Sequence, residues 1–247
     1  MHVFQHYILT RFNDGIYGPN SKLTVPPDEW MDHRLRLFTT FTMPSMMEQT
    51  CQNFTWLVLM DGRTPDRYNQ EIESFRYPNL RLIYPTPTGG RWSQAFKPGD
   101  YDLITTRIDN DDAFHRDAIA ALQRTYLAEH EKRAKPWVMV FPYGFLMNLV
   151  SQDLWGMEYW YNNCPTLVGS GSDGKNVFQW RHHEIPAEVA KCYIDDKPYW
   201  LQIVHVHNLQ NGIPVEGHPY KILHKDIPIS LEWLIQFGVA PDRLPVG

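Results

Sequence analysis

The residues best suited to chemistry lie in one short segment, residues 101–115. Three carboxylates, Asp109, Asp111 and Asp112, directly follow an apolar and β-branched run, residues 103–108, that has the length of a strand. Like charges at a strand end are unfavourable unless a cation or hydrogen-bond donors compensate them. Hard oxygen ligands at alternate positions suit Mg²⁺ or Mn²⁺, which can in turn hold the phosphates of a nucleotide. The segment therefore predicts a metal-dependent nucleotide-sugar site.

The same acids also have a simpler structural interpretation. Asp112 can cap the amino end of a helix predicted over residues 113–132, and Asp109 and Asn110 can form a turn. An isolated Asp-x-Asp is common by chance, which favours this interpretation for the motif taken alone. The strand before the acids and the helix after them favour a ligand site, so both interpretations stay open at this point.

Two earlier strands are expected to end at the same sheet edge as these acids. Residues 6–12 have the pattern of a first buried strand, and residues 54–60 form the clearest strand, a continuous apolar run followed at once by Asp61. Such runs are typical of parallel strands covered on both faces, and ligands of open α/β sheets bind at the carboxyl ends of those strands. Asp61 could accept hydrogen bonds from a nucleoside there; its alternative role is a turn-forming Asp-Gly.

The remaining patterns predict a single α/β domain over residues 1–247. With 247 residues and 43% hydrophobic content, the chain can bury a substantial core. Further helical patterns occupy residues 28–41, 44–49, 66–75, 186–192 and 231–237. Further strand patterns occupy residues 80–84, 136–141, 145–150, 177–181 and 200–208, with 145–150 a candidate partner of 136–141.

Two other segments carry side chains that suit an anion or a metal. Gly89 and Gly90 permit close backbone approach and Arg91 adds a cation, as in a phosphate-contacting loop, although such loops are commonly connectors. His205 and His207 follow a strand pattern near the end of the chain, where a neutral imidazole could complete a carboxylate metal shell. A lone histidine is more commonly a hydrogen-bonded structural residue, so this role depends on the acidic cluster.

The segment from residue 151 to 174 is predicted to be irregular and is rich in aromatic and glycine residues. Its rings close together in sequence are Trp155, Tyr159, Trp160 and Tyr161. They predict either an acceptor-binding wall or a hydrophobic mini-core beneath a long loop.

Composition limits the partners and the compartment. The 23 basic and 28 acidic residues give a formal charge of −5 without a basic cluster, which argues against nucleic acid as a partner. The three cysteines are widely spaced and form no disulfide framework or CxxC pair, as expected of reduced thiols in the cytoplasm. The sequence has neither a secretory leader pattern nor a span of roughly 18 apolar residues, which predicts a soluble protein with at most peripheral membrane contact.

Four motifs in this order resemble the putative rhamnosyltransferase family, whose members are similar to GT-A glycosyltransferases. They are Thr-Arg-Phe-Asn at residues 10–13, Trp-Leu-Val-Leu-Met-Asp at 56–61, Thr-Arg-Ile-Asp-Asn-Asp-Asp at 106–112 and Trp-Leu-Gln-Ile-Val-His at 200–205. The resemblance extends from about residue 6 to residue 208. It implies a GT-A fold, with a central mixed, mostly parallel sheet flanked by helices.

The resemblance also implies roles for particular residues. Asp61 would hold the nucleoside, Asp109 and Asp111 would engage ribose, diphosphate and Mn²⁺ or Mg²⁺, and His205 would be a late metal ligand. The family pattern leads us to expect a small residue soon after that histidine, whereas this chain reads Val-His-Val-His-Asn, so His207 is the alternative ligand. The predicted nucleotide-sugar-binding set consists of Arg11, Asp61, Arg91 and Asp109.

A catalytic base for an inverting transfer is expected between the Asp-x-Asp and the late histidine. The carboxylates in that interval are Asp153, Glu158, Asp173, Glu184, Glu188, Asp195 and Asp196. Glu184 is the preferred candidate because it precedes a predicted helical turn and has histidine neighbours that can tune its pKa. Asp173, in a glycine-rich turn, is the second candidate.

The leading hypothesis is therefore a glycosyltransferase that moves a sugar, with rhamnose as the candidate, from a nucleoside diphosphate to a glycan or lipid-linked acceptor. A metal-dependent phosphohydrolase is one alternative, but it would need its acid pair after the first strand rather than about the fourth. A non-catalytic nucleotide- or carbohydrate-binding module is another. Transfer or hydrolysis assays with Mn²⁺ distinguish the three.

Overall fold

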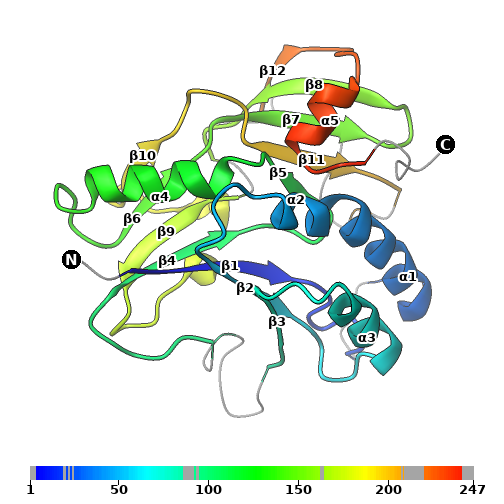
Figure 1. Cartoon of the computed structure of the whole chain (residues 1–247), viewed down its shortest axis with the longest axis horizontal. Helices are drawn as coiled ribbons and strands as arrows, with labels where there is room; N and C mark the ends of the chain where they lie inside the picture. The colour runs from blue at the N-terminus through cyan, green and yellow to red at the C-terminus, as the bar shows by residue number, and fades with distance from the viewer. Residues whose placement is uncertain are drawn as a thin grey trace.

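The strands form two sheets that are joined by the acidic segment (Figure 1). The computed structural model describes residues 4–18, 21, 23, 25–85, 92, 95–161, 164–206, 208 and 220–240. The seven-stranded sheet has the order β10-β6-β9-β4-β1-β2-β3. Its strands are β1 (Phe4–Arg11), β2 (Thr55–Leu59), β3 (Leu80–Ile83), β4 (Asp102–Arg107), β6 (Trp137–Val140), β9 (Thr166–Ser170) and β10 (Ala190–Tyr193).

The five-stranded sheet has the order β12-β8-β7-β11-β5. Its strands are β5 (Ala113–Phe114), β7 (Tyr143–Asn148), β8 (Asp153–Glu158), β11 (Trp200–Val204) and β12 (Lys221–His224). Because β4 belongs to one sheet and β5 to the other, residues 108–112 cross between them. The acidic cluster therefore lies within this crossing from one sheet to the other.

Parallel pairing brings the predicted strand ends to one edge. β1 pairs in parallel with both β2 and β4, with Arg11 opposite Leu59 and Leu9 opposite Arg107. β3 is parallel to β2, and β9 alone runs antiparallel, between β4 and β6. The carboxyl ends of β1, β2 and β4 consequently lie side by side, as predicted from their apolar runs. The central, mostly parallel sheet of a mixed α/β fold is confirmed.

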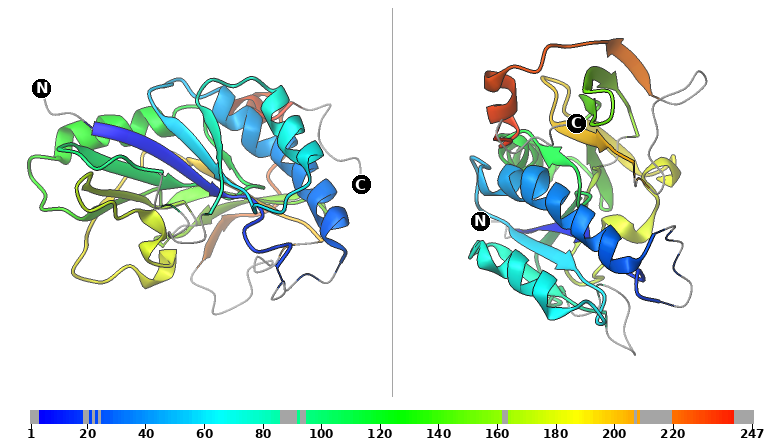
Figure 2. Two further views of the ribbon diagram at one scale, coloured as in Figure 1. Left: turned by 90° about the horizontal axis from the view of Figure 1, so that it is seen from below. Right: turned by 90° about the vertical axis from the view of Figure 1, so that its right-hand side faces the viewer.

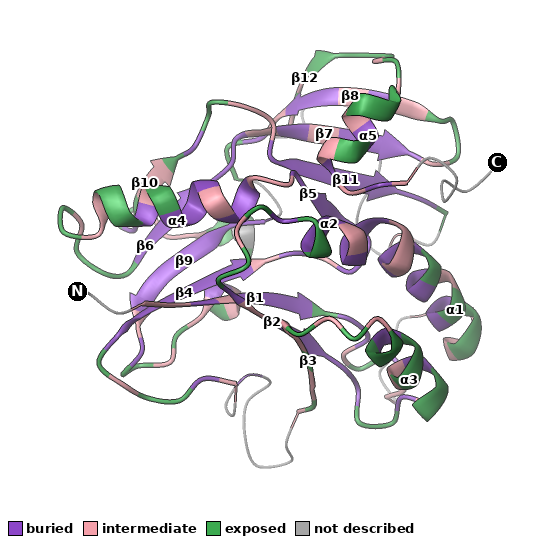
Figure 3. Ribbon diagram, in the orientation of Figure 1, coloured by how far each residue is buried: buried purple, intermediate pink, exposed green. Residues whose placement is uncertain are grey.

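The two faces of this sheet are covered differently. Alternate side chains such as Ile8, Val58 and Ile104 pack with residues of the helices, whereas Leu9 and Leu103 face the other way, toward aromatic residues of irregular segments. The helices on the first face are α1 (Pro27–Leu37), α3 (Asp66–Ser74) and α4 (Ala118–Glu129). Figure 3 shows the buried strands beneath helices whose outer faces are exposed. This alternation fixes which side chains can reach the site from each strand.

Helix α1 begins and ends as its sequence favours. Pro27 occupies its first turn together with Asp28 and Glu29, and Arg34 and Arg36 occupy its last turn, an arrangement that complements the helix dipole. The helix continues through a π-helical turn, Phe38–Thr42, into α2 (Met43–Met47). Figure 2 shows α1 and α3 side by side at one end of the molecule. The predicted helix at 28–41 is thus confirmed as part of a longer helical segment.

A smaller core lies between the five-stranded sheet and the helices around it. Leu201 and Ile203 of β11 pack with Leu37 and Phe41 and with residues of α5 (Leu231–Gln236), the predicted C-terminal helix. The Ser230 side chain caps α5 by accepting a hydrogen bond from the Trp233 backbone N–H at 3.1 Å. Helix α1–α2 therefore contacts both sheets.

Several local predictions were wrong because pairing over long distances overrides local pattern. The helix predicted from Ala113 is β5 followed by α4, since residues 113–114 pair with β11. Residues 145–150 do not pair with 136–141, because β7 lies in the other sheet beside β8 and β11. The segment predicted to be irregular, 151–174, contains β8 and β9.

Two further secondary-structure predictions were wrong: a predicted strand is a 3₁₀ turn, and a predicted helical turn ends in a strand. The strand predicted at 177–181 is a 3₁₀ turn, Val177–Gln179, because the Asn176 side chain accepts a hydrogen bond from the Phe178 backbone N–H at 3.0 Å. The helical turn predicted at 186–192 instead ends in β10, which adds to the edge of the sheet beside β6. The three cysteines are free thiols. None of the helices among the described residues is long and apolar enough to cross a membrane.

Candidate functional site

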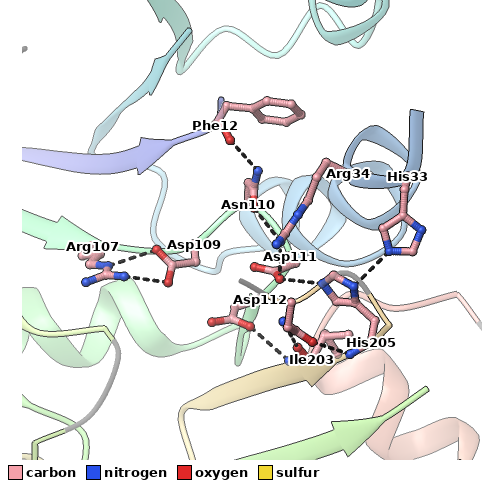
Figure 4. Close-up of polar contacts among 11 residues, drawn as sticks. Phe12, His33, Arg34, Arg107, Asp109, Asn110, Asp111, Asp112, Ile203 and His205 are labelled. Carbon is pink, nitrogen blue, oxygen red and sulfur yellow. Dashed lines mark hydrogen bonds and ion pairs between the residues drawn. The ribbon is translucent and has the colours of Figure 1, made fainter. Parts of the chain in front are cut away.

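The segment between the two sheets is held by hydrogen bonds at both ends (Figure 4). The Asn110 side-chain amide donates to the Phe12 carbonyl at 2.8 Å, which ties the segment to the end of β1. An Asp112 carboxyl oxygen accepts from the Ile203 backbone N–H at 3.0 Å, which ties it to β11. The acidic segment is thus fixed between the strand ends of two sheets.

Asp111 is the centre of the cluster. Its side chain is 4% exposed, and its Oδ2 accepts hydrogen bonds from Arg34 Nη1 and lies 3.0 Å from His205 Nε2. Arg34 also donates to Asn110 Oδ1 at 3.1 Å. The structure therefore brings together two of the predicted metal ligands, Asp111 from the connecting segment and His205 from the end of β11.

The third predicted ligand, Asp109, has a different partner. Its two carboxyl oxygens accept from Arg107 Nε and Nη2 at 3.0 and 2.7 Å, a bidentate pair. Figure 4 shows Asp109 directed toward Arg107 and Asp111 directed toward His205. Among the described residues, no three histidine, cysteine, aspartate or glutamate side chains gather closely enough to hold a metal by themselves.

Asp112 has a structural role that differs from the predicted one. The N-cap of α4 is Asp117, so the interpretation of Asp112 as a helix cap is wrong. Burial, with the nearby Asp111 and Asp109 carboxylates, raises the pKa of the Asp112 carboxyl well above its usual range. One of its oxygens is bonded to β11, while Oδ2 has no hydrogen-bond partner among the described residues. The hydrogen bond from Ile203 to Asp112 thus joins the second sheet to the acidic segment.

Asp61 lies at the end of β2, as predicted, in a network with β1. Its backbone N–H donates to Asn13 Oδ1 at 2.9 Å, and the Asn13 amide donates to Thr64 Oγ1 at 2.8 Å. The carboxylate accepts from Arg63 Nε and Nη2 at 2.9 and 2.7 Å. These hydrogen bonds with Arg63 hold the pKa of Asp61 below its usual value. Asp61 is therefore an ionised residue that orders the turn, as the turn-forming interpretation predicted, and its contact with a nucleoside stays a prediction.

Arg11, a predicted nucleotide-sugar-binding residue, lies on the other face of the sheet. Arg11 lies 4.7 Å from the centre of the Phe178 ring, which stacks on Trp92 at 5.3 Å. These residues line a cavity of about 290 Å³ together with Lys175 and Asn176. Arg91 and His207 are outside the described residues. Arg107, the partner of Asp109, also lies over Phe178 at 5.6 Å, so this cavity adjoins the acidic cluster.

A second cavity adjoins the opposite side of the cluster. Its volume is about 400 Å³, within the range of small-ligand pockets. It lies between α1 and the ends of β7 and β11, and its lining comprises His33, Arg36, Leu37, Thr39, Thr40, Leu149, Val150, His205 and Val206. The predicted metal ligand His205 is therefore part of a cavity wall.

The two candidate bases form local contacts. Glu184 lies in a 3₁₀ turn, His182–Glu184, with its side chain 53% exposed, 3.5 Å from Arg181 Nη1 and 3.7 Å from His183 Nε2. Asp173 accepts from the Lys175 backbone N–H at 3.0 Å, as a turn residue does. The contacts described above join neither Glu184 nor Asp173 to Asp109, Asp111 or His205.

The aromatic segment contributes one ring to the core and two rings to the exposed surface. Tyr159 is buried in the main core, whereas Trp160 and Tyr161 are 38% and 48% exposed. Tyr159 is thus part of the main core rather than of a separate mini-core, and two rings remain accessible.

Two residues of the cluster were missed from the sequence, His33 and Arg34. Arg34 is 5% exposed and lies on the buried face of α1 with Trp30 and Leu35. An arginine on the apolar stripe of a helix requires a buried partner, and this signal could have identified it. His33 Nε2 lies 3.0 Å from His205 Nδ1, a contact that no sequence pattern indicates.

The fold is a mixed α/β fold whose central, mostly parallel sheet has one antiparallel strand, and carboxylates follow β2 and β4 at the sheet edge where such folds bind ligands. The sequence profile of the family described as "Putative rhamnosyl transferase" matches residues 23–217. The chain belongs to this family. A search of curated protein sequences gave no match.

The chain is also similar to solved structures of S. aureus TarS. Against TarS 1–349 the identity is 14% and the TM-score 0.46, with 81% of this chain and 60% of that chain covered. The UDP complex gives the same identity and TM-score with 82% and 60% covered. The UDP-GlcNAc complex gives 14% identity and a TM-score of 0.45, with 85% and 62% covered. This chain thus spans about three fifths of the TarS 1–349 structure.

Proposed function

We propose that the protein is a divalent-metal-dependent, inverting glycosyltransferase that transfers rhamnose from a nucleoside diphosphate to a hydroxyl of a glycan or lipid-linked acceptor. Membership of the family supports transfer of a sugar from a nucleotide donor, and rhamnose comes from the description of that family. The observation that carries the metal proposal is the 3.0 Å contact between Asp111 and His205. These residues are far apart in sequence and come from the ends of strands in two sheets.

The residues present fit Mg²⁺ or Mn²⁺. Asp111 supplies a carboxylate oxygen and His205 an imidazole nitrogen, both nearly buried. Such ions are commonly held by one or two protein ligands, with substrate phosphates and water completing the shell. A two-residue anchor therefore suffices when a nucleoside diphosphate is bound. The ion would neutralise the charge that develops on the leaving diphosphate.

The protein's own residues orient the donor along the strand ends. Asp61, ionised at the end of β2, accepts hydrogen bonds from the nucleoside. Asp109 is proposed to engage the ribose and diphosphate, and Arg11 and Arg91 are proposed to bind its anionic part. Asp61 follows β2 and Asp109 follows β4, and β1, which ends at Arg11, lies between these two strands in the sheet. The donor thus extends from Asp61 toward Asp111 and His205.

The acceptor hydroxyl needs a carboxylate base on the face opposite the leaving diphosphate. Glu184 is our candidate, with Asp173 second. Glu184 is more than half exposed, so it is accessible to an acceptor in the resting structure. Asp173 is already engaged by a turn N–H, which makes it the poorer proton acceptor.

A donor screen tests the proposal. Thermal shifts are measured with nucleoside diphosphate sugars, including rhamnose carried by thymidine, uridine and guanosine diphosphate, with and without Mn²⁺. Ligands that bind only the folded state raise the melting temperature, so the donor is expected to give a Mn²⁺-dependent shift. Asp111→Asn should abolish the Mn²⁺-dependent part, Asp61→Asn should weaken nucleotide binding with or without metal, and Glu131→Gln, at an exposed position, should change neither. A donor that binds equally well without Mn²⁺ and to Asp111→Asn would refute the metal assignment.

Glu184→Gln tests the base separately. It is expected to keep donor affinity and to lose transfer by a factor of about 10² or more, typical of a general base. Turnover within about tenfold of the parent would exclude Glu184 and direct the test to Asp173.

A further inference from the structure

Helix α1 places two consecutive side chains on the cluster, and they contact different members of it. Arg34 binds Asp111, and His33 Nε2 lies 3.0 Å from His205 Nδ1. The two imidazole rings are 4.8 Å apart at their centres and inclined by 49°, so the contact is edge-on through nitrogen rather than stacked. His205 therefore has Asp111 on one ring nitrogen and His33 on the other (Figure 4).

We propose that His33 is the positioning residue that holds the His205 ring in the orientation needed to bind the metal through Nε2. A histidine that binds a metal through one nitrogen carries its proton on the other, and that N–H is normally held by a fixed acceptor. Since Nε2 of His205 faces Asp111, Nδ1 is the nitrogen that must carry the proton. His33 Nε2 is the acceptor in place for it.

The same pair of rings also fits the metal-free state. A carboxylate oxygen only accepts, so a neutral His205 that bonds to Asp111 carries its proton on Nε2. Its Nδ1 then accepts from His33 Nε2–H. On metal binding each ring keeps one proton but carries it on its other nitrogen, and the hydrogen bond between the rings is retained with reversed direction. His33 can thus fix the ring plane of His205 in both states.

His33 is suited to this role because its helix is anchored on both sides. The Tyr68 hydroxyl of α3 donates to Asp32 Oδ1 at 2.9 Å and lies 3.1 Å from the Asp28 carbonyl. On the other side, Arg34, beside His33, is buried and donates to Asn110 Oδ1 at 3.1 Å and to Asp111. A side chain on such a helix is more precisely placed than one on a loop. His205, by contrast, follows the last residue of β11 and needs this support.

The test measures metal binding rather than turnover, and it depends on the proposed metal site. Mn²⁺ is titrated by calorimetry into the full chain saturated with UDP, and with dTDP as a second probe. His33→Ala is expected to weaken Mn²⁺ affinity by about 10- to 100-fold, the usual effect of removing such a hydrogen bond. His33→Gln, whose amide oxygen can accept from Nδ1–H, should give an intermediate affinity. Glu29→Ala, exposed on the same helix, should match the parent.

A second readout needs no metal. In the metal-free parent the ¹⁵N shift of His205 Nδ1 should be that of a nitrogen that accepts a hydrogen bond, and it should move toward the value of a nitrogen without this bond in His33→Ala, while Asp111 keeps the proton on Nε2 in both; circular dichroism confirms that the variant is folded. Unchanged Mn²⁺ affinity and an unchanged Nδ1 shift in folded His33→Ala would overturn the role of His33 while leaving the metal proposal intact. A parent that binds UDP and dTDP but no Mn²⁺ would overturn both together.

Discussion

Replacing Arg34 by methionine tests whether the acidic cluster depends on a buried cation. The Arg34 and Asp111 side chains are 6% and 4% exposed, so their ion pair is almost completely removed from water. Methionine retains much of the volume of the arginine stem but leaves Asp111 without the guanidinium. The two other carboxyl groups of the cluster, Asp109 and Asp112, are close by and cannot compensate it.

The expected cost follows from this burial. Removing one partner of a buried ion pair typically costs about 3–5 kcal/mol, because the remaining charge is left uncompensated. We therefore expect Arg34→Met to lower the free energy of unfolding by about 3–5 kcal/mol. If Mn²⁺ with a nucleotide replaces the missing cation at Asp111, a ligand concentration 100 times its Kd should restore about 2.7 kcal/mol.

Urea unfolding followed by tryptophan fluorescence measures both effects, provided that the m value is unchanged. The double variant Arg34→Met with Asp111→Asn removes both charges and should be more stable than Arg34→Met alone. Arg67→Met is a control, because the Arg67 and Asp28 side chains are 59% and 58% exposed and their ion pair should matter little to stability. A cost below about 1 kcal/mol for Arg34→Met, or additive effects in the double variant, would refute the reasoning.

Three further changes have expected outcomes. Gly144→Ala would place a Cβ 2.0 Å from the buried indole of Trp200 and should cost about 3 kcal/mol or more in urea unfolding, whereas Gly62→Ala meets nothing within 4 Å and should be tolerated. Burial lowers the pKa of His6 from 6.5 to about 3, so its contribution to stability is present above pH 6.5 and is lost as pH falls toward 3; comparison with His6→Gln should show a loss of roughly 2.3 kcal/mol between pH 6.5 and 4.5. Asp112→Asn should change stability near pH 7 little, because burial raises the pKa of the parent carboxyl and so disfavours its charged form, and the amide oxygen can still accept from the Ile203 N–H; a large loss would contradict this.

The sequence predicted the half of the fold whose strands are continuous apolar runs. β1, β2 and β4 are covered on both faces, so each is an apolar run in the sequence whichever strand lies beside it. Parallel pairing of these strands then places Asp61 and Asp109 at one edge of the sheet. The second sheet could not be predicted in this way. Its parallel pair, β7 and β11, is separated by more than fifty residues, and the alternation within each strand does not specify which strand lies beside it.

The sequence predicted the site residues that follow strands, and it did not predict the two site residues of helix α1. Asp111 and His205 follow strand patterns, so their positions could be inferred from topology. Arg34 lies 77 residues before Asp111, and the helical period shows only that it faces the core, not which strand end it meets. His33 is one residue further around the helix and only half-buried, so its contact with His205 depends on how α1 lies across both sheets.

Three neighbouring carboxyl groups in this segment have three different partners, and this explains why they are not interchangeable. Asp109 forms a bidentate ion pair with Arg107 from its own strand at the sheet edge. Asp112 accepts from a backbone N–H of β11 and so joins the sheets, and burial raises the pKa of its carboxyl. Asp111 Oδ2 meets both the Arg34 guanidinium from α1 and the imidazole of His205, which follows β11. These three environments within four residues therefore follow from the segment's position between two sheets and beneath one helix.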